Sequence, residues 1–116
     1  MGQIFFGSPA RTHYILFMAN VTGGSMAAHR CSCYFSGRVQ GVGFRYTAKN
    51  IAIRHNVTGY IKNLNDGRVE MVLEGPDEEL DQVVESIKGR MSGYIRQVDR
   101  SLCPATGEFA QFYIRH

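Results

Sequence analysis

From residue 31 onward, the hydrophobic and polar positions follow regular patterns that predict a series of short elements. Apolar and polar residues alternate between Cys31 and Ser36, which is typical of a half-buried strand. From Phe44 to about His55 the spacing becomes helical, with one apolar stripe made of Phe44, Ala48, Ile51 and Ala52. The pattern therefore predicts a strand followed by a helix.

The next two predicted elements are strands joined by a tight turn. Thr58 to Asn63 is expected to be a strand, and Arg68 to Glu74 is expected to return beside it. Asn65-Asp66-Gly67 lies between them and is a strong hairpin signal, because these residue types adopt left-handed turn conformations readily. In the returning strand, one face carries the apolar residues Val69, Met71 and Leu73.

The last part of the chain predicts a second helix and two more strands. Gly75-Pro76 interrupts the third strand, and residues at helical spacing follow it up to Gly89, namely Leu80, Val83, Val84 and Ile87. Tyr94 to Ser101 and Phe109 to Arg115 are the remaining predicted strands. The order β-α-β-β-α-β with an extra C-terminal strand predicts an α+β, ferredoxin-like α/β sandwich, with two helices on one face of an antiparallel sheet.

Composition narrows the class of protein further. The chain has 116 residues, of which 44% are hydrophobic and 20% charged, so one domain can fold without disulfides or metals. A formal charge of +3 is too small to indicate nucleic-acid binding. The three cysteines are an odd number, which argues for core thiols in a reducing cytoplasm, and the four scattered histidines make no metal signature. We expect no metal and no cofactor.

Residues 1–28 differ from the rest of the chain. Their two apolar clusters are too short to span a membrane, and they match a secretory signal poorly. Gly23-Gly24-Ser25 before Met26 is typical of a fusion junction. We therefore expect residues 1–28 to be a fusion-derived or poorly ordered leader, and residues 29–116 to form the functional domain.

A glycine-rich turn between the first strand and the first helix is the main candidate for chemistry. It reads Gly37-Arg38-Val39-Gln40-Gly41-Val42-Gly43-Phe44-Arg45. Glycines leave the main chain accessible, and the first amides of a helix lack intrahelical partners, so such a turn can hold a phosphate. Both common nucleotide fingerprints fail here, which leaves a cradle for a small anion. Arg45, a cation in the first helical turn, would pair with that anion.

Asn63 is a second candidate, at the end of the second predicted strand. Its amide could accept a hydrogen bond from a water molecule, or it could simply form the turn, as Asn65 does. The residues alone do not decide between these two interpretations.

Two segments together resemble a known family. Gly37 to Arg45 resembles the first signature of the acylphosphatase family, and Gly59 to Gly67 is similar to its second signature, in the family's order and spacing. The resemblance covers Arg30 to His116. It implies hydrolysis of the carboxyl-phosphate bond of a small-molecule acyl phosphate, without a metal or a phosphoenzyme. It also implies that Asn63 orients the attacking water.

These inferences define the expected site and its alternatives. Arg45 and Asn63 are the expected catalytic residues, and the expected phosphate-binding residues are Arg38, Val39, Gln40, Gly41, Val42, Gly43 and Arg45. We expect a cytoplasmic monomer with no nucleic-acid or membrane partner. One alternative is a non-catalytic RNA- or anion-binding module, because Gly41 to Tyr46 echoes a glycine-aromatic RNA-binding motif. Another is an acylphosphatase-like domain of a larger carbamoyl-transfer enzyme, although a free-standing hydrolase is the simpler expectation.

Overall fold

A computed structural model of the protein describes residues 28–116. The leader expected over residues 1–28 lies outside the described residues, except that Ala28 is already part of the first strand. The described elements are, in order, β1 (Ala28–Gly37), α2 (Phe44–Ala52), β2 (Thr58–Asn63), β3 (Val69–Pro76), α3 (Asp77–Arg90), β4 (Ile95–Pro104) and β5 (Phe112–Arg115). The predicted order β-α-β-β-α-β with an additional strand is thus confirmed.

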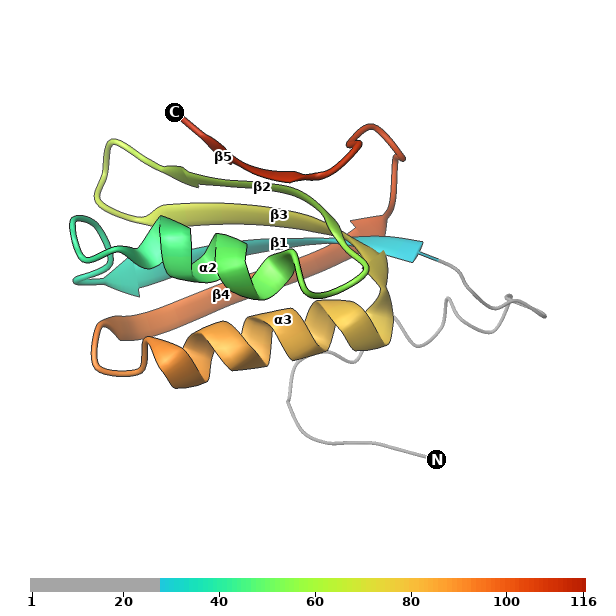
Figure 1. Cartoon of the computed structure of the whole chain (residues 1–116). Helices are drawn as coiled ribbons and strands as arrows, with labels where there is room; N and C mark the ends of the chain where they lie inside the picture. The colour runs from blue at the N-terminus through green and yellow to red at the C-terminus, as the bar shows by residue number, and fades with distance from the viewer. Residues whose placement is uncertain (1–27) are drawn as a thin grey trace.

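The five strands form one sheet in the order β4-β1-β3-β2-β5, and both helices cover the same face of it (Figure 1). The β1–β3, β1–β4 and β2–β3 pairs are antiparallel, as expected. The β2–β5 pair is parallel, so the sheet is mixed and the prediction of a wholly antiparallel sheet needs this correction. The long 105–111 connection carries the chain from β4 at one edge to β5 at the other, which allows the parallel pairing.

The core lies between the sheet and the helices. The predicted apolar stripe of α2 is buried, as is that of α3. They pack against the buried faces of β1 and β3, whose members are Cys31, Cys33, Phe35, Val69, Met71 and Leu73. Burying a side chain of this size contributes about 1.5–3 kcal/mol before the entropy cost is counted. The alternation and helical periodicity of the sequence therefore identified the core correctly.

The first helix is shorter than the predicted Phe44 to His55. The α-helix ends at Ala52. Beyond it, Arg54 N–H donates to Ile51 O at 3.1 Å and His55 N–H to Ala52 O at 3.0 Å, each spanning three residues rather than four. The last predicted turn is therefore tightened and is no longer α-helical.

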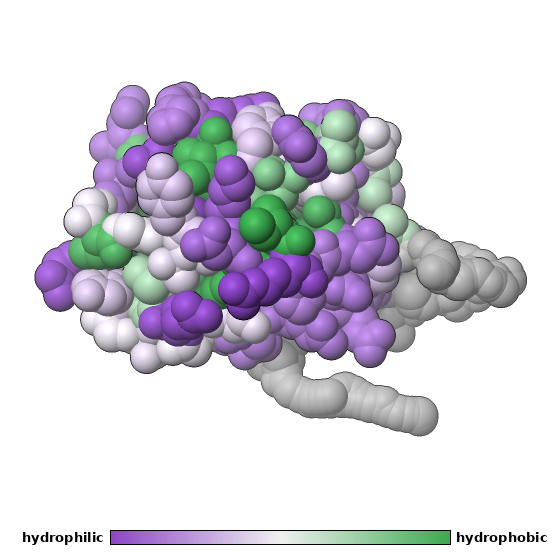
Figure 2. Space-filling view, viewed as in Figure 1, coloured by the Kyte–Doolittle hydropathy of each residue, from purple (hydrophilic) through white to green (hydrophobic). Residues whose placement is uncertain are grey.

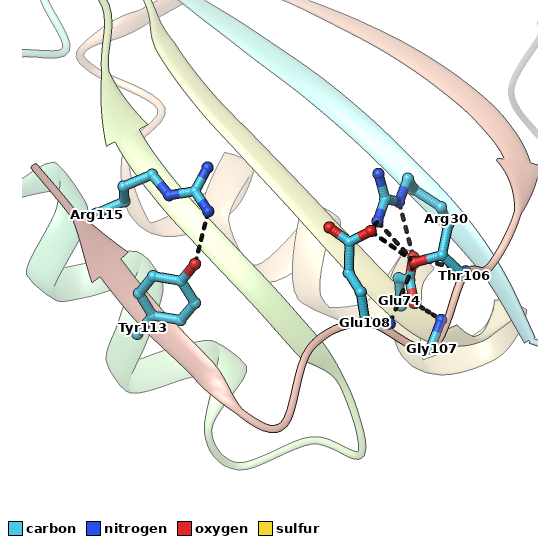
Figure 3. A network of polar contacts seen from close by, with 7 residues as sticks. All are labelled: Arg30, Glu74, Thr106, Gly107, Glu108, Tyr113 and Arg115. Atoms are coloured by element: carbon cyan, nitrogen blue, oxygen red, sulfur yellow. Dashed lines mark hydrogen bonds and ion pairs between the residues drawn. The ribbon is translucent and has the colours of Figure 1, made fainter.

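A buried carboxylate fixes the connection that leads to β5 (Figure 3). Glu74 on β3 accepts hydrogen bonds from Arg30 Nε at 2.7 Å, from Thr106 N–H and Oγ1–H at 3.0 and 3.1 Å, and from Gly107 N–H at 2.9 Å. Burial alone would raise the pKa of Glu74, but these backbone and guanidinium donors outweigh burial and lower it. Glu108 adds a 3.1 Å ion pair to Arg30.

The outer surface of the two helices carries mainly hydrophilic residues, with hydrophobic ones in separate small areas (Figure 2). Within residues 28–116, no helix is both long and apolar enough to cross a membrane.

Candidate active site

Three connections meet at one end of the sheet, near the start of α2 (Figure 1). They are the loop that the sequence predicts to bind phosphate, called the phosphate loop (residues 38–43, between β1 and α2), the hairpin turn (residues 64–68, between β2 and β3) and the 91–94 connection before β4. Hydrogen bonds join the phosphate loop to each of the other two. The two segments that sequence analysis selected therefore lie side by side, although they are far apart in the chain.

The phosphate loop depends on glycine at its two ends. Gly37 has φ 127°, and a Cβ there would lie 2.4 Å from Tyr94 O, so only glycine fits. Gly43 is the N-cap of α2 in the left-handed conformation, with φ 79°. Because Gly43 has no side chain to cap the helix and the first turn has no acidic residue, the first amides of α2 have no local anionic partner. This end of the helix suits an anion.

Arg45 lies in that first turn and is half-buried. Within residues 28–116, three other arginines are half-buried, and each has a side-chain partner: Arg30 bonds Glu74, Arg68 bonds Asp66, and Arg115 bonds the Tyr113 hydroxyl. The described residues give Arg45 no such partner. Its guanidinium is thus available to a ligand while partly shielded from water, a condition that strengthens charge–charge attraction.

Arg38 occupies a different place from Arg45. It is exposed, its N–H donates to Tyr94 O at 2.9 Å, and its guanidinium lies over the Tyr94 ring at 5.1 Å from the centroid. This stacking holds the start of the phosphate loop against the 91–94 connection. The interior of the loop is anchored by Val39, which is buried, and by Val42, which packs against the core.

The side chain of Gln40 joins the phosphate loop to the hairpin turn. Its Nε2 donates to Leu64 O at 2.8 Å and to Arg68 O at 2.9 Å. Sequence reasoning included Gln40 only for its backbone amide and missed this contact. No local signal could have shown it, because the acceptors lie 24 and 28 residues further along the chain.

Asn63 is the last residue of β2, directly before the hairpin turn, and pairs with Val69. Its Oδ1 atom is buried and accepts no hydrogen bond, and it is the only buried side-chain nitrogen or oxygen within residues 28–116 of which this is true. Leaving a buried acceptor unsatisfied costs about 1–3 kcal/mol. The Asn63 oxygen therefore takes no part in the hydrogen bonds of the hairpin turn and is available as an acceptor.

The described residues hold no group of three or more histidine, cysteine, aspartate or glutamate side chains that could bind a metal ion. They also place Gly41 to Tyr46 in the phosphate loop and the first turn of α2, rather than on a strand. The aromatic members of this segment are therefore not displayed on the sheet face, as an RNA-recognition module would require.

Comparison with known proteins agrees with this geometry. The family model described as Acylphosphatase matches residues 31–114, a range that includes the phosphate loop, Arg45 and Asn63. The chain belongs to the acylphosphatase family. A curated acylphosphatase of Pyrobaculum islandicum is 41% identical over 87 residues, which cover 73% of this chain and 92% of the relative.

Two further likenesses support the family and the fold. An acylphosphatase of Bacillus velezensis is 56% identical over 52 residues, which cover 45% of this chain but only 58% of the relative. The crystal structure of acylphosphatase from Bacillus subtilis is similar with a TM-score of 0.69 and 30% identity, and the match covers 76% of this chain and 99% of that one. The predicted family and ferredoxin-like fold are both confirmed.

Proposed function

We propose that this protein hydrolyses the carboxyl-phosphate bond of acyl phosphates, giving a carboxylate and inorganic phosphate. The observation that carries the proposal is the junction of phosphate loop and hairpin turn. It brings a half-buried guanidinium and a buried amide oxygen to the same end of the sheet, and neither has a hydrogen-bond partner within residues 28–116. Membership of the acylphosphatase family supports the same activity.

The chemistry of the substrate explains why so few groups suffice. An acyl phosphate is a mixed anhydride, and its carboxylate leaves without needing a proton. The catalyst has to hold the phosphoryl group, stabilise the charge of a loose transition state and place a water in line with the breaking bond. No nucleophilic side chain is required by this route.

The phosphate loop and Arg45 bind the phosphoryl group. The backbone amides of Val39 to Gly43 surround the phosphoryl oxygens, and the Arg45 guanidinium donates to two of them at once. The positive charge of the guanidinium group also offsets part of the negative charge of the substrate. Arg38 adds a positive charge at the entrance of the loop and attracts the dianionic substrate.

Asn63 holds the attacking water. Its Oδ1 accepts a hydrogen bond from the water and directs an oxygen lone pair at phosphorus, opposite the leaving carboxylate. The substrate phosphate takes the proton that the water releases, so no side-chain base is needed. The reaction proceeds without a metal ion, and we further propose that the protein works as a cytoplasmic monomer.

The test is steady-state release of phosphate from benzoyl phosphate with a chelator present. Arg45→Ala and Asn63→Ala should each lower kcat/KM about 10²–10³-fold, the loss typical for removal of one transition-state donor. Arg54→Ala and Asn50→Ala are matched controls, because both residues are exposed and lie outside the three connections of the candidate site, and they should retain parental activity.

A folded parent protein that releases no phosphate would overturn the proposed activity. Anion or RNA binding by the loop would then be the better hypothesis. Equal losses in the control variants would show instead that the fall in rate does not report on Arg45 and Asn63.

A further inference from the structure

The Gln40 side chain makes a contact that phosphate binding does not require. Its amide nitrogen has two N–H groups, and both are used, one for Leu64 O and one for Arg68 O. The same two carbonyls also close the hairpin turn. Leu64 N–H donates to Arg68 O at 2.8 Å, and Gly67 N–H donates to Leu64 O at 3.2 Å. Gln40 is therefore part of the hydrogen-bond pattern that shapes the turn.

This turn directly follows Asn63. Leu64 is the next residue in the chain, and Arg68 precedes Val69, the strand partner of Asn63. A shift of the carbonyls of Leu64 and Arg68 would therefore move the backbone next to Asn63 and the backbone next to its strand partner. Contacts within the turn also stiffen it, since Arg68 N–H and Nε both donate to the Asp66 carboxylate. Gln40 supplies the side-chain hydrogen bonds that tie the turn to the phosphate loop.

We propose that Gln40 is a positioning residue that sets the distance between the phosphate loop and the amide of Asn63. Gln40 touches neither substrate nor water through its side chain. It acts by joining the element that binds phosphorus to the element that holds the nucleophile. This inference rests on the proposed hydrolysis and adds a residue role to it.

Catalytic geometry explains why such a link matters. In-line attack requires the water oxygen to lie about 3–3.5 Å from phosphorus, and a misplacement of about 1 Å can cost a hundredfold in rate. The two groups concerned belong to different elements, namely the loop before α2 and the end of β2. A glutamine amide suits the link, because its two donors form a planar fork. A glutamate would place oxygen atoms against the two carbonyls, and a methionine would bring no donor.

The experiment is a double-mutant cycle on Gln40 and Asn63, measured with benzoyl phosphate. Gln40→Met keeps the length of the side chain and removes both donors. In the parent it should lower kcat at least about tenfold, with the inhibition constant of inorganic phosphate changed less than about threefold. In an Asn63→Ala background the same substitution should lower kcat less than about twofold, because the group that Gln40 positions is gone.

Gln97→Met is the matched control. Gln97 also donates two hydrogen bonds, but to the exposed carboxylate of Asp99 on β4, and its replacement should leave kcat unchanged in both backgrounds. If Gln40→Met does not fold by circular dichroism, Gln40→Asn takes its place. That variant keeps the amide but withdraws it by one methylene.

Four other outcomes would contradict the positioning role of Gln40. Equal loss of kcat in the two backgrounds would mean that Gln40 acts on the loop alone, and unchanged kcat in the parent background would mean that the contact has no catalytic role. A rise in the phosphate inhibition constant matching the loss of kcat would assign Gln40 to binding. A folded parent without turnover would remove the proposed function, and this inference with it.

Discussion

The two ends of the sheet differ in whether their polar side chains have hydrogen-bond partners. At the end away from the phosphate loop, Glu74 forms hydrogen bonds with Arg30 and with the 105–111 connection (Figure 3). These contacts hold the connection that leads to β5. At the phosphate loop, Arg45 and Asn63 Oδ1 have no such partners among the described residues. Two arginines of similar burial thus have different environments, one structural and one open to a ligand.

This difference indicates how stability and function are divided in a small domain. Satisfied buried groups stabilise the fold, whereas unsatisfied ones cost stability and are available for binding. Substitutions at the two ends should therefore separate the two properties.

Exchanging the two arginines for alanine should give the largest contrast. Arg45→Ala should lower kcat/KM about 10²–10³-fold and leave the free energy of unfolding nearly unchanged, because no hydrogen bond or ion pair among residues 28–116 is lost. Arg30→Ala should leave the activity of the folded protein intact. It should lower the free energy of unfolding by about 2–3 kcal/mol, since Glu74 loses its charged donor. Urea denaturation and phosphate release, measured on both variants, would contradict the comparison if the two effects were reversed.

Glu74→Ala should be the most destabilising single change at the far end. It leaves Arg30, Thr106 and Gly107 with unpaired donors, at a cost of about 2–4 kcal/mol in the free energy of unfolding. Glu85→Ala is the control, because Glu85 is exposed and within residues 28–116 bonds only Lys88, and its loss should cost less than about 0.5 kcal/mol. Equal effects of the two substitutions in urea would show that the Glu74 network does not stabilise the fold.

Asn63→Ala should move stability and activity in opposite directions. Removing a buried acceptor that has no partner should raise the free energy of unfolding by about 1 kcal/mol, while hydrolysis falls. Thermal and urea denaturation measure the first effect and benzoyl phosphate turnover the second. A destabilised Asn63→Ala variant would mean that the Asn63 side chain supports the hairpin turn rather than the reaction.

Acid should weaken the network around Glu74. The pKa of Glu74 is lowered on folding, so its ionised form stabilises the protein fully above the unfolded-state pKa of about 4.3, and this contribution is lost as the pH falls through the lower folded-state value. The stability of Glu74→Gln should accordingly depend less steeply on pH than that of the parent between about pH 5 and pH 3. Parallel curves for the two proteins, from urea titrations across this range, would contradict the assignment.

Local patterns in the sequence predicted the elements correctly and selected the candidate site residues. Alternation in β1 and helical spacing in α2 and α3 identified the buried residues, because each pattern acts within one element and needs no partner. The glycine run located the phosphate loop for the same reason, since a left-handed backbone at Gly43 is a local requirement. The two signatures then selected Arg45 and Asn63.

Which polar groups have hydrogen-bond partners follows only from the folded structure. The parallel pairing of β5 with β2, the saturation of Glu74 and the contact of Gln40 with the hairpin turn all join residues far apart in the chain. No local pattern encodes them, because a hydrogen bond depends on the position of both partners and not on the type of either. Arg30 and Arg45 are the same residue type in the sequence, and only the folded chain shows that the first bonds a carboxylate while the second has no such partner among residues 28–116.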